Sequence, residues 1–537
     1  MTGLSKHHLR LPPPSLKDNT ASIDRLAKAL RKEAGAWPLV PKSYLNSFAS
    51  VIREADYQVT ATLAQNKDMT VLVEVEPGDT TPSQPPAQLQ ERAMQVPSSL
   101  WGAEGLGVAL DIGSTHLQAS LHDLAGGGEL AQTTLLNPQT GAGSDILTRI
   151  HYAADPERHQ QLCDQLAEAA ASAIDQMCAQ AGRDTEEVAG LAAAGNTTMT
   201  HFFLGLDVQS LCREPYIPVV NRPAPFYAAD LGLKLAPGAV VWCMPNVGSY
   251  FGGDLVAGIV AAGLHQRQGT AMLVDVGTNA EVVLGNRDWL VACAGAAGPA
   301  LEGGVASRGI LAQPGAIEKV VIDPQSKEPS LQIIPDAQGR TPRPKGLCGS
   351  GLLTLLAQLY LTGVMDMRGR FVLKDHPRMI STDEGWGYVV ATAEESAGGE
   401  AMVVNEVEID ILLRSKAAMY TILRTVTKEV GVEFSDLEAI FVAGAFGNVI
   451  DPETAVTLGM LPDLPRERFR PLGNSSLAGC QQILIHPQTR PQVEEITEKL
   501  TYLELNVNQA LMNRFSAARF IPHTDAARFP SVPILGR

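Results

Sequence analysis

The sequence predicts an α/β protein with two similarly built halves and a small α+β domain in front of them. An apolar strand that ends in Asp111 is followed by Gly-Ser and a second apolar strand, and the same pattern follows Asp275. The two acids are about one domain length apart, which indicates a duplicated subdomain. A third pattern, a buried strand that runs into the glycine-rich turn Gly444–Asn448, is typical of a strand-to-helix junction at a ligand site.

Composition argues against a nucleic-acid-binding, membrane or secreted protein. The chain has 537 residues, 45 % hydrophobic and 19 % charged, with a formal net charge of −16. An acidic chain argues against a nucleic-acid or anionic-membrane partner. No apolar run approaches the roughly 18 residues that would indicate a membrane span, and the first residues show no secretory signal. These observations predict a cytoplasmic protein.

The seven cysteines show no metal-binding or disulfide spacing. They stand alone along the chain, without a C-x-x-C pair, and none occurs before Cys163. Ferredoxin-type clusters need several closely spaced thiolates. We therefore expect scattered buried thiols and no [2Fe–2S] cluster in this chain.

Stretches rich in proline, glycine and polar residues predict the domain boundaries. Residues 1–35 are interpreted as an extended lead-in with a linker helix, 36–80 as a small α+β middle domain, and 81–104 as a flexible linker. Residues 105–537 are expected to form one large domain, with subdomains at about 105–265 and 266–537. Residues 248–263 are expected to form a helix rich in small residues, which favours close helix packing at a hinge. The tail after Tyr502 is expected to be strand-like and to pack back on the body.

The two acidic turns predict a phosphate site. A tight turn of small residues directs backbone N–H groups at an anion, and a carboxylate beside it holds Mg²⁺ through water. Asp111 and Asp275 are the metal candidates. Asn196 follows a buried strand and either orients water or phosphate or caps the next helix, and the sequence leaves both roles open.

Glycine-dense segments supply the remaining candidate contacts. Residues 295–309 form a loop that fits either a backbone cradle or a mobile segment, and Gly349–Gly351 enter a helix at its N-terminus, where phosphate or adenosine can bind. The cofactor-binding candidates are Gly113, Ser114, Thr115, Gly277, Thr278, Asn279, Glu281, Gly298, Glu302, Gly349, Ser350, Gly351, Gly444, Ala445, Phe446, Gly447 and Asn448, with Asp111, Asp275 and Asn196 as catalytic candidates.

The order of two phosphate turns and an adenosine turn resembles the superfamily of acetate and sugar kinases, heat-shock ATPases and actin. More specific segments resemble the reductive activators of corrinoid proteins. They include LPPPSLKDNTASIDRLAKALR (11–31), VIREADYQVT (51–60), EPGDT (76–80), AAAGNTTMTHFFLGLD (192–207), LVDVGTNAEVVLG (273–285), AAGPALEGG (296–304), GLCGSGLL (346–353) and VAGAFGNVIDPETAVTLGMLPD (442–463).

The resemblance implies duplicated actin-like (ribonuclease H-like) ATPase subdomains and a homodimer. It implies an ATPase that uses MgATP to drive a corrinoid protein of a methyltransferase system from Co(II) to Co(I). Typical members begin with a [2Fe–2S] ferredoxin domain before the proline-rich lead-in, so we expect a separate low-potential electron donor here. A small-molecule kinase, or a partner protein that binds ATP without turnover, remains the alternative; a 2-hydroxyacyl-CoA dehydratase activator would need subunit-bridging cluster cysteines.

Overall fold

In the computed structural model, the chain forms two compact units. The first holds residues 1–261 and 475–499, and the second holds 262–474 and 500–537. The residues described are 4–16, 18–35, 37–66, 69–85, 88–97, 99–277, 279–296, 306–444, 451–503 and 509–535.

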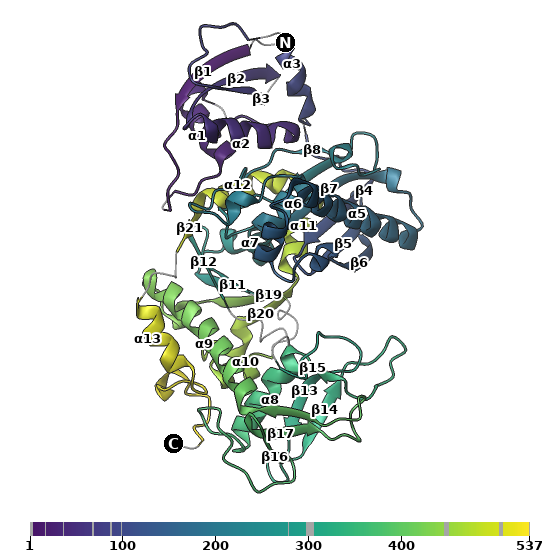
Figure 1. The fold of residues 1–537 in the computed structure, drawn as a ribbon, viewed down its shortest axis with the longest axis vertical. Helices are drawn as coiled ribbons and strands as arrows, with labels where there is room; N and C mark the ends of the chain where they lie inside the picture. The colour runs from purple at the N-terminus through teal and green to yellow at the C-terminus, as the bar shows by residue number, and fades with distance from the viewer. Residues whose placement is uncertain are drawn as a thin grey trace. The chain divides into compact units, whose positions relative to one another are not determined.

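The chain opens with a three-stranded antiparallel sheet, β1(Leu4–Arg10), β2(Gln58–Asn66) and β3(Met69–Pro77), in the order β1-β2-β3. Two helices, α1(Ser22–Ala34) and α2(Leu45–Glu54), lie beside it (Figure 1). The strands after residue 57 and the helix before them agree with the sequence patterns. The lead-in differs, because residues 4–10 pair with β2 along their whole length.

The segment expected to be a flexible linker contains buried anchors. A short helix α3(Leu89–Arg92) packs Leu89 and Ala93 into a small cluster with Val73 of β3. Arg92 donates to the Val73 carbonyl at 2.6 Å. Trp101 is also buried, and its indole N–H donates to the carbonyl of Leu484. Apolar residues spaced among Pro, Gln and Ser therefore fix parts of this segment.

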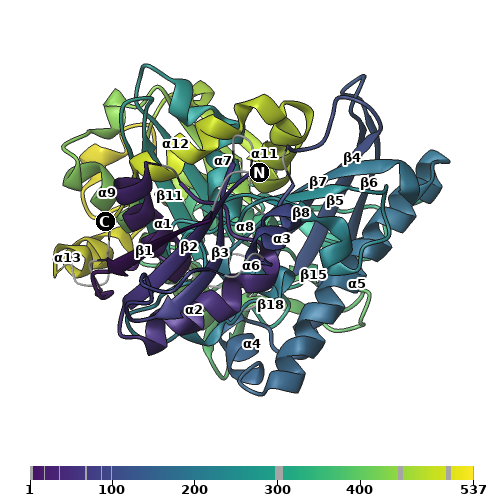
Figure 2. The ribbon, with the colours of Figure 1, turned by 90° about the horizontal axis from the view of Figure 1, so that it is seen from above.

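The first six-stranded sheet has the order β6-β5-β4-β7-β9-β8. A hairpin and a third antiparallel strand, β4(Leu106–Ile112), β5(His116–Asp123) and β6(Glu129–Leu136), are extended by β7(Val188–Gly195) and β9(Val240–Cys243), which run parallel to β4. The short β8(Phe226–Tyr227) closes the far edge. Helix α5(Pro156–Ala181) runs along β5 and β6 (Figure 2).

The second six-stranded sheet repeats this plan. β10(Ala271–Val276), β11(Asn279–Gly285) and β12(Leu290–Ala296) form the antiparallel part, and β19(Ala439–Gly444) and β20(Phe469–Gly473) continue in parallel from β10. β21(Leu500–Tyr502) adds one strand beyond β12. Five strands of the two sheets correspond, with β4 equivalent to β10 and β7 equivalent to β19, whereas β8 and β21 lie at opposite edges. This correspondence confirms the predicted α/β fold with duplicated subdomains.

One helix of the C-terminal part belongs to the first unit. α11(Ser475–Ile485) follows β20 in sequence but packs on β4 and β7. It crosses α7(Gly253–Ala262) closely, since a Cβ at Gly479 would lie 2.2 Å from the Ala257 carbonyl oxygen. The predicted boundary at residue 266 therefore differs from the structure by this returning segment, and the small residues of α7 serve close helix packing as expected.

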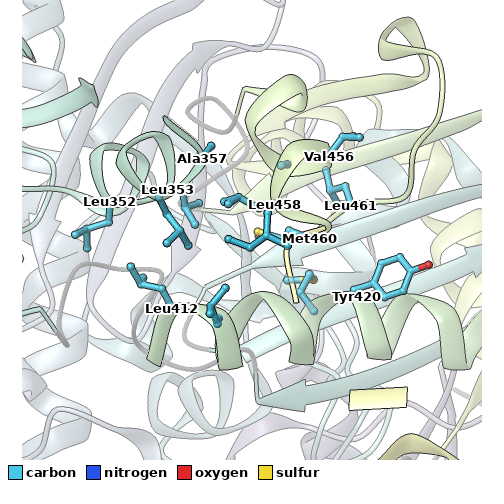
Figure 3. Packing of buried hydrophobic residues seen from close by; sticks show 14 of the residues in the cluster. Leu352, Leu353, Ala357, Leu412, Tyr420, Val456, Leu458, Met460 and Leu461 are labelled. Atoms are coloured by element: carbon cyan, nitrogen blue, oxygen red, sulfur yellow. The ribbon is translucent and has the colours of Figure 1, made fainter. Parts of the chain in front are cut away.

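The second unit carries two further sheets and a large helical core. One sheet has the order β14-β13-β15 and is formed by β13(Ala316–Ile322), β14(Pro329–Ile333) and β15(Gly346–Leu347). The other has the order β16-β17-β18 and is formed by β16(Met379–Thr382), β17(Gly385–Ala391) and β18(Met402–Asn405). Leucines of α8(Gly349–Leu361) and α9(Glu406–Glu429) pack against α10(Pro452–Leu458) and the residues after it (Figure 3). This core fixes the start of α8, a predicted ligand contact.

The tail packs back on the body as predicted, but it is not strand-like. Residues 509–518 form helix α13, which lies against α9. The buried Lys416 of α9 donates to the Pro522 carbonyl at 2.8 Å, and the Tyr360 hydroxyl donates to the Pro533 carbonyl at 2.9 Å. Among the residues that the structure describes, no helix is both long and apolar enough to cross a membrane.

Candidate nucleotide site

The first acidic turn has the hairpin geometry that the sequence predicts. Asp111 is the second-last residue of β4 and pairs with Gln118 across the hairpin. Its side chain is half-buried, whereas Thr115 at the tip of the turn is exposed. A Cβ at Gly113 would lie 2.4 Å from the His116 carbonyl oxygen, so only glycine fits this turn. The backbone is therefore closed tightly beside the carboxylate.

Asn137, which follows β6, braces the turn from behind. It is fully buried, its side-chain amide donates to the Gly113 carbonyl at 2.9 Å, and its backbone N–H donates to the Thr115 carbonyl at 2.8 Å. In a planar trans peptide the next N–H points opposite to the carbonyl. The Ser114 N–H therefore points away from Asn137, in the orientation that an anion-binding turn needs.

A serine of the returning helix holds the Asp111 carboxylate. The Ser476 hydroxyl, at the start of α11, donates to Asp111 Oδ1 at 2.7 Å. One turn later, Cys480 is fully buried, and burial together with the nearby Asp111, Cys243 and Asp254 raises the pKa of its thiol. Cys480 is therefore a protonated packing residue near the carboxylates of Asp111 and Asp254.

Asn196 follows the strand next to Asp111. β7 pairs with β4 so that Gly195 lies opposite Ile112, one residue beyond the Asp111–Ala194 pair. The Asn196 side-chain oxygen accepts from the Met199 N–H at 2.9 Å and caps α6(Thr197–Leu204). Of the two roles left open by the sequence, the structure shows the capping role, and Asn196 is half-buried at the same strand end as Asp111.

The second acidic turn places Asp275 at the equivalent point of the second sheet. Asp275 pairs with Glu281 of β11 on one side and with Ala443 of β19 on the other. Gly444 adopts a φ of +80°, and a Cβ there would lie 2.4 Å from Asp275 Oδ1. Both the left-handed backbone and this close approach require glycine. Glu281 and Gly277 are half-buried beside the carboxylate.

The predicted contact at Gly349–Gly351 lies at the first turn of α8. All three residues are buried, and no side-chain hydrogen bond caps this helix at Cys348. A Cβ at Gly351 would lie 2.1 Å from the Ile317 carbonyl oxygen, and the Ser350 hydroxyl lies 3.2 Å from the Cys348 sulfur. Packing of α8 on β13(Ala316–Ile322) therefore explains Gly351 without a ligand.

Several predicted contacts lie outside the described residues. These are Thr278, Gly298, Glu302, Ala445, Phe446, Gly447 and Asn448, and for Asn279 only the backbone position at the start of β11 is described.

Comparison with known proteins assigns the chain to a family. Three family models match in succession: the RACo linker region over residues 2–82, the RACo middle region over 106–267, and the C-terminal domain of RACo, the ASKHA domain, over 269–533. The chain belongs to the RACo family. The family that the sequence motifs resembled, the reductive activators of corrinoid proteins, is confirmed.

Individual relatives agree with the RACo assignment. The corrinoid activation enzyme RamQ of Eubacterium limosum is 32 % identical over 408 residues, which cover 74 % of this chain and 67 % of RamQ. The [Co(II) methylated amine-specific corrinoid protein] reductase of Methanosarcina barkeri is 23 % identical over 419 residues, 74 % of this chain and 73 % of that protein. A solved reductive activator for a corrinoid, iron-sulfur protein is 33 % identical, with a TM-score of 0.71 over 98 % of this chain and 80 % of that one.

Asp254 is an acid near the first acidic turn that the sequence interpretation did not include among the site candidates. It begins α7, is half-buried, and its Oδ1 accepts from the Leu255 N–H at 2.8 Å. A Cβ at Gly252 would lie 2.2 Å from the Asn196 Cα and 2.6 Å from Asp254 Oδ1, so this turn rests on the Asn196 turn. The sequence signal that could have indicated Asp254 is an acid directly after two glycines at the start of a helix, because helix N-termini often face ligands.

The donor set of this first unit fits a magnesium–nucleotide complex. Mg²⁺ is typically held by one or two carboxylates, with phosphate oxygens and waters completing its shell. Among the described residues no cluster of three or more His, Cys, Asp or Glu could hold a metal alone. Asp111 and Asp254, half-buried near Cys480, match the smaller carboxylate set.

Proposed function

We propose that this protein is an ATP-dependent reductive activator of a corrinoid protein in a methyltransferase system. It would use ATP binding and hydrolysis to assist reduction of Co(II) to Co(I), with electrons from a separate low-potential donor. The observation that carries this proposal is the duplicated acidic hairpin, with Asp111 and Asp275 at equivalent strand ends, in a chain of the RACo family. The named activities of the relatives support the corrinoid protein as partner.

The energetic reason for coupling to ATP is a potential gap. A one-electron step uphill costs about 1.4 kcal/mol for each 59 mV. A gap of roughly 300 mV therefore needs about 7 kcal/mol, which the electron donor itself does not provide. ATP binding can supply it if it stabilises a protein conformation that changes the corrinoid environment.

The chain's own residues have defined roles in this proposal. The Ser114 N–H and the neighbouring turn would bind phosphate oxygens. Asp111 and Asp275 would hold the magnesium ion, and Asp254 would orient the attacking water. When bound, Mg²⁺ would neutralise phosphate charge, the main requirement of phosphoryl transfer. The start of α8 and the Gly444–Asn448 turn would hold the adenosine.

The assembly and location are parts of the same proposal. We assign a homodimer, as the resemblance implies, which light scattering on the purified protein tests. All seven cysteines are free, and six are buried. Free thiols in this number suit a reducing compartment, so we place the protein in the cytoplasm.

An anaerobic assay tests the function. Candidate corrinoid proteins are mixed with this protein, a low-potential reductant and MgATP, and cobalt absorbance is followed. The proposal predicts ATP-dependent formation of Co(I), and no Co(I) when ATP is replaced by ADP. Turnover of ATP into a phosphorylated metabolite without any corrinoid protein would instead indicate a small-molecule kinase, and ATP binding without turnover would indicate a non-catalytic partner protein.

A further inference from the structure

The first compact unit contains an open cavity of about 250 Å³. Its wall is formed by the end of α2, by one residue of the proline-rich lead-in and by residues between 207 and 217, which follow α6. None of the lining residues belongs to either acidic turn. Pockets for drug-sized ligands usually measure about 300–1,000 Å³, so this cavity has the size for a smaller molecule.

The backbone around this cavity is strained. Among the described residues, four other than glycine have a positive φ, and three of them are Asp56 at +47°, Tyr57 at +62° and Tyr216 at +63°. Tyr57 lines the cavity, and Tyr216 lies between the lining residues Pro215 and Ile217. Strained residues of this kind cluster at ligand sites, where the side chain is needed in spite of its backbone cost.

The strain at Tyr57 is informative because glycine would remove it. The Tyr57 N–H donates to the Ile52 carbonyl at 3.0 Å and closes the end of α2. Left-handed residues at helix ends are usually glycine, which has no Cβ penalty. The turn alone therefore does not explain a tyrosine here, whereas a role for its side chain in the cavity does.

The Tyr57 hydroxyl is an unused donor beside a cation. It forms no hydrogen bond in the described part of the chain. Burial raises the pKa of Tyr57, although the nearby Arg53 and Arg25 oppose this effect, so the hydroxyl stays protonated at neutral pH. The Arg53 side chain is 28 % exposed and donates to the Ser210 hydroxyl at 3.3 Å. The hydroxyl and the guanidinium together suit a carboxylate.

The charged groups of the wall sum to zero. Arg53 and Asp207 form an ion pair at 3.5 Å between Nη1 and Oδ2. Arg213 and Glu214 are both exposed, and Arg213 donates to the Gln209 side-chain oxygen at 3.4 Å. Glu214 has no hydrogen bond or ion pair with any described residue. The wall therefore offers an unpaired carboxylate as well as the donors beside Tyr57.

Apolar residues form the rest of the wall. Ile217 is buried, and Pro14 and Pro215 are half-buried. The carbonyl of the intervening Tyr216 accepts from the Ser249 hydroxyl, and its ring lies 5.9 Å from the Tyr250 ring. These contacts fix the apolar part of the wall, which an aliphatic group can cover.

We propose that this cavity binds a small zwitterionic amino acid with an aliphatic side chain. The carboxylate of the ligand accepts from the Tyr57 hydroxyl and the Arg53 guanidinium, and its ammonium group faces Glu214. A ligand with both charges matches a neutral wall that carries cations and anions, whereas a simple anion or cation leaves one sign unmatched. The inference does not depend on the nucleotide site.

Calorimetric titration of the full-length protein tests the class of ligand. The probes are L-valine, L-leucine and L-isoleucine, and two analogues of leucine, 4-methylpentanoate without the amino group and 3-methylbutylamine without the carboxylate. Loss of the carboxylate should weaken binding by about tenfold to a hundredfold. Loss of the ammonium group, whose partner Glu214 is exposed, should weaken it by about twofold to fivefold.

Two variants locate the binding. Tyr57→Phe should weaken the binding of leucine by about tenfold to a hundredfold without lowering the melting temperature, because the hydroxyl has no partner among the described residues. Glu214→Gln should weaken leucine by about twofold to fivefold but leave 4-methylpentanoate unchanged. The control is Glu168→Gln, an exposed acid on α5. If Tyr57→Phe does not fold, Glu214→Gln decides by its comparison of leucine with 4-methylpentanoate.

Three outcomes overturn the inference. They are no binding of any of the three amino acids to the natural protein, equal affinity for leucine and 4-methylpentanoate, and unchanged leucine affinity in both variants. The second would indicate a site for a simple carboxylate, and the third a site elsewhere. None of them affects the formation of Co(I) with ATP, which tests the proposed function separately.

Discussion

The two halves place their acids by the same strand pattern but hold them by different means. In the first half, Asp111 accepts from Ser476, and Asn137 braces the turn beside it. In the second half, Asp275 lies against Gly444, whose left-handed backbone leaves room for the carboxylate. The duplicated topology therefore fixes the position of each carboxylate, whereas residues that differ between the two halves determine what supports it.

The largest expected effect is that of Gly444→Ala. The new Cβ combines a strained φ of +80° with a 2.4 Å approach to Asp275 Oδ1. We expect the free energy of unfolding to fall by about 2–4 kcal/mol and ATP turnover to be lost. Gly195→Ala, the counterpart in the first half, lacks the positive φ and should cost only about half as much by the same reasoning.

Urea denaturation and a phosphate-release assay measure these changes. The control is Gly398→Ala, because that glycine is exposed and a Cβ there meets nothing within 4 Å. A Gly444→Ala protein with natural stability and activity would show that the space beside Asp275 has no functional importance.

A smaller effect is expected for Ser476→Ala. The change removes the 2.7 Å hydrogen bond to Asp111 but leaves its carboxylate in place. A hydrogen bond to a charged group contributes about 1.5–3 kcal/mol, so kcat/KM for ATP should fall by about tenfold to a hundredfold. The control is Ser172→Ala, an exposed serine on α5. Unchanged kinetics would mean that Asp111 is positioned by its strand alone.

The smallest effect at neutral pH comes from two buried histidines, one in each half, which are expected to make the free energy of unfolding fall in acid. In the first, the buried His201 lies 2.7 Å from the Thr197 carbonyl through Nδ1 and accepts from the Val219 N–H through Nε2, which requires the neutral ring. Burial lowers its pKa to about 4. In the second, burial, with Arg528 and Lys416 nearby, lowers the pKa of His523 to about 4.

The unfolded chain binds these protons at higher pH than the folded one, so stability should be constant above about pH 6.5 and fall between about pH 6.5 and 4. For His201 the loss is about 3 kcal/mol by linkage. Urea denaturation across this pH range measures it, and His201→Gln, which retains a donor and an acceptor, should flatten part of the slope. An unchanged slope in this variant would exclude His201 as the source.

The two acidic turns could be predicted from the sequence because each strand, turn and second strand are contiguous in the chain. Asp111 and Asp275 were predicted at their observed strand ends for this reason. The role of Ser476 could not be predicted, because its partner Asp111 lies 365 residues away in sequence and the contact depends on α11 belonging to the first unit. β1 was interpreted as a lead-in because its partner, β2, begins almost fifty residues later. Local patterns therefore predict turns, and contacts across the chain need the fold.

The most direct test of the central claim is ATP turnover in Asp111→Ala and Asp275→Ala, each compared with the natural protein under identical magnesium and ATP concentrations. If one magnesium-bound triphosphate uses both acidic turns, each single variant should fold and lose turnover by about a hundredfold or more. Turnover at the natural rate in either folded variant would contradict the account, because one acidic turn would then suffice.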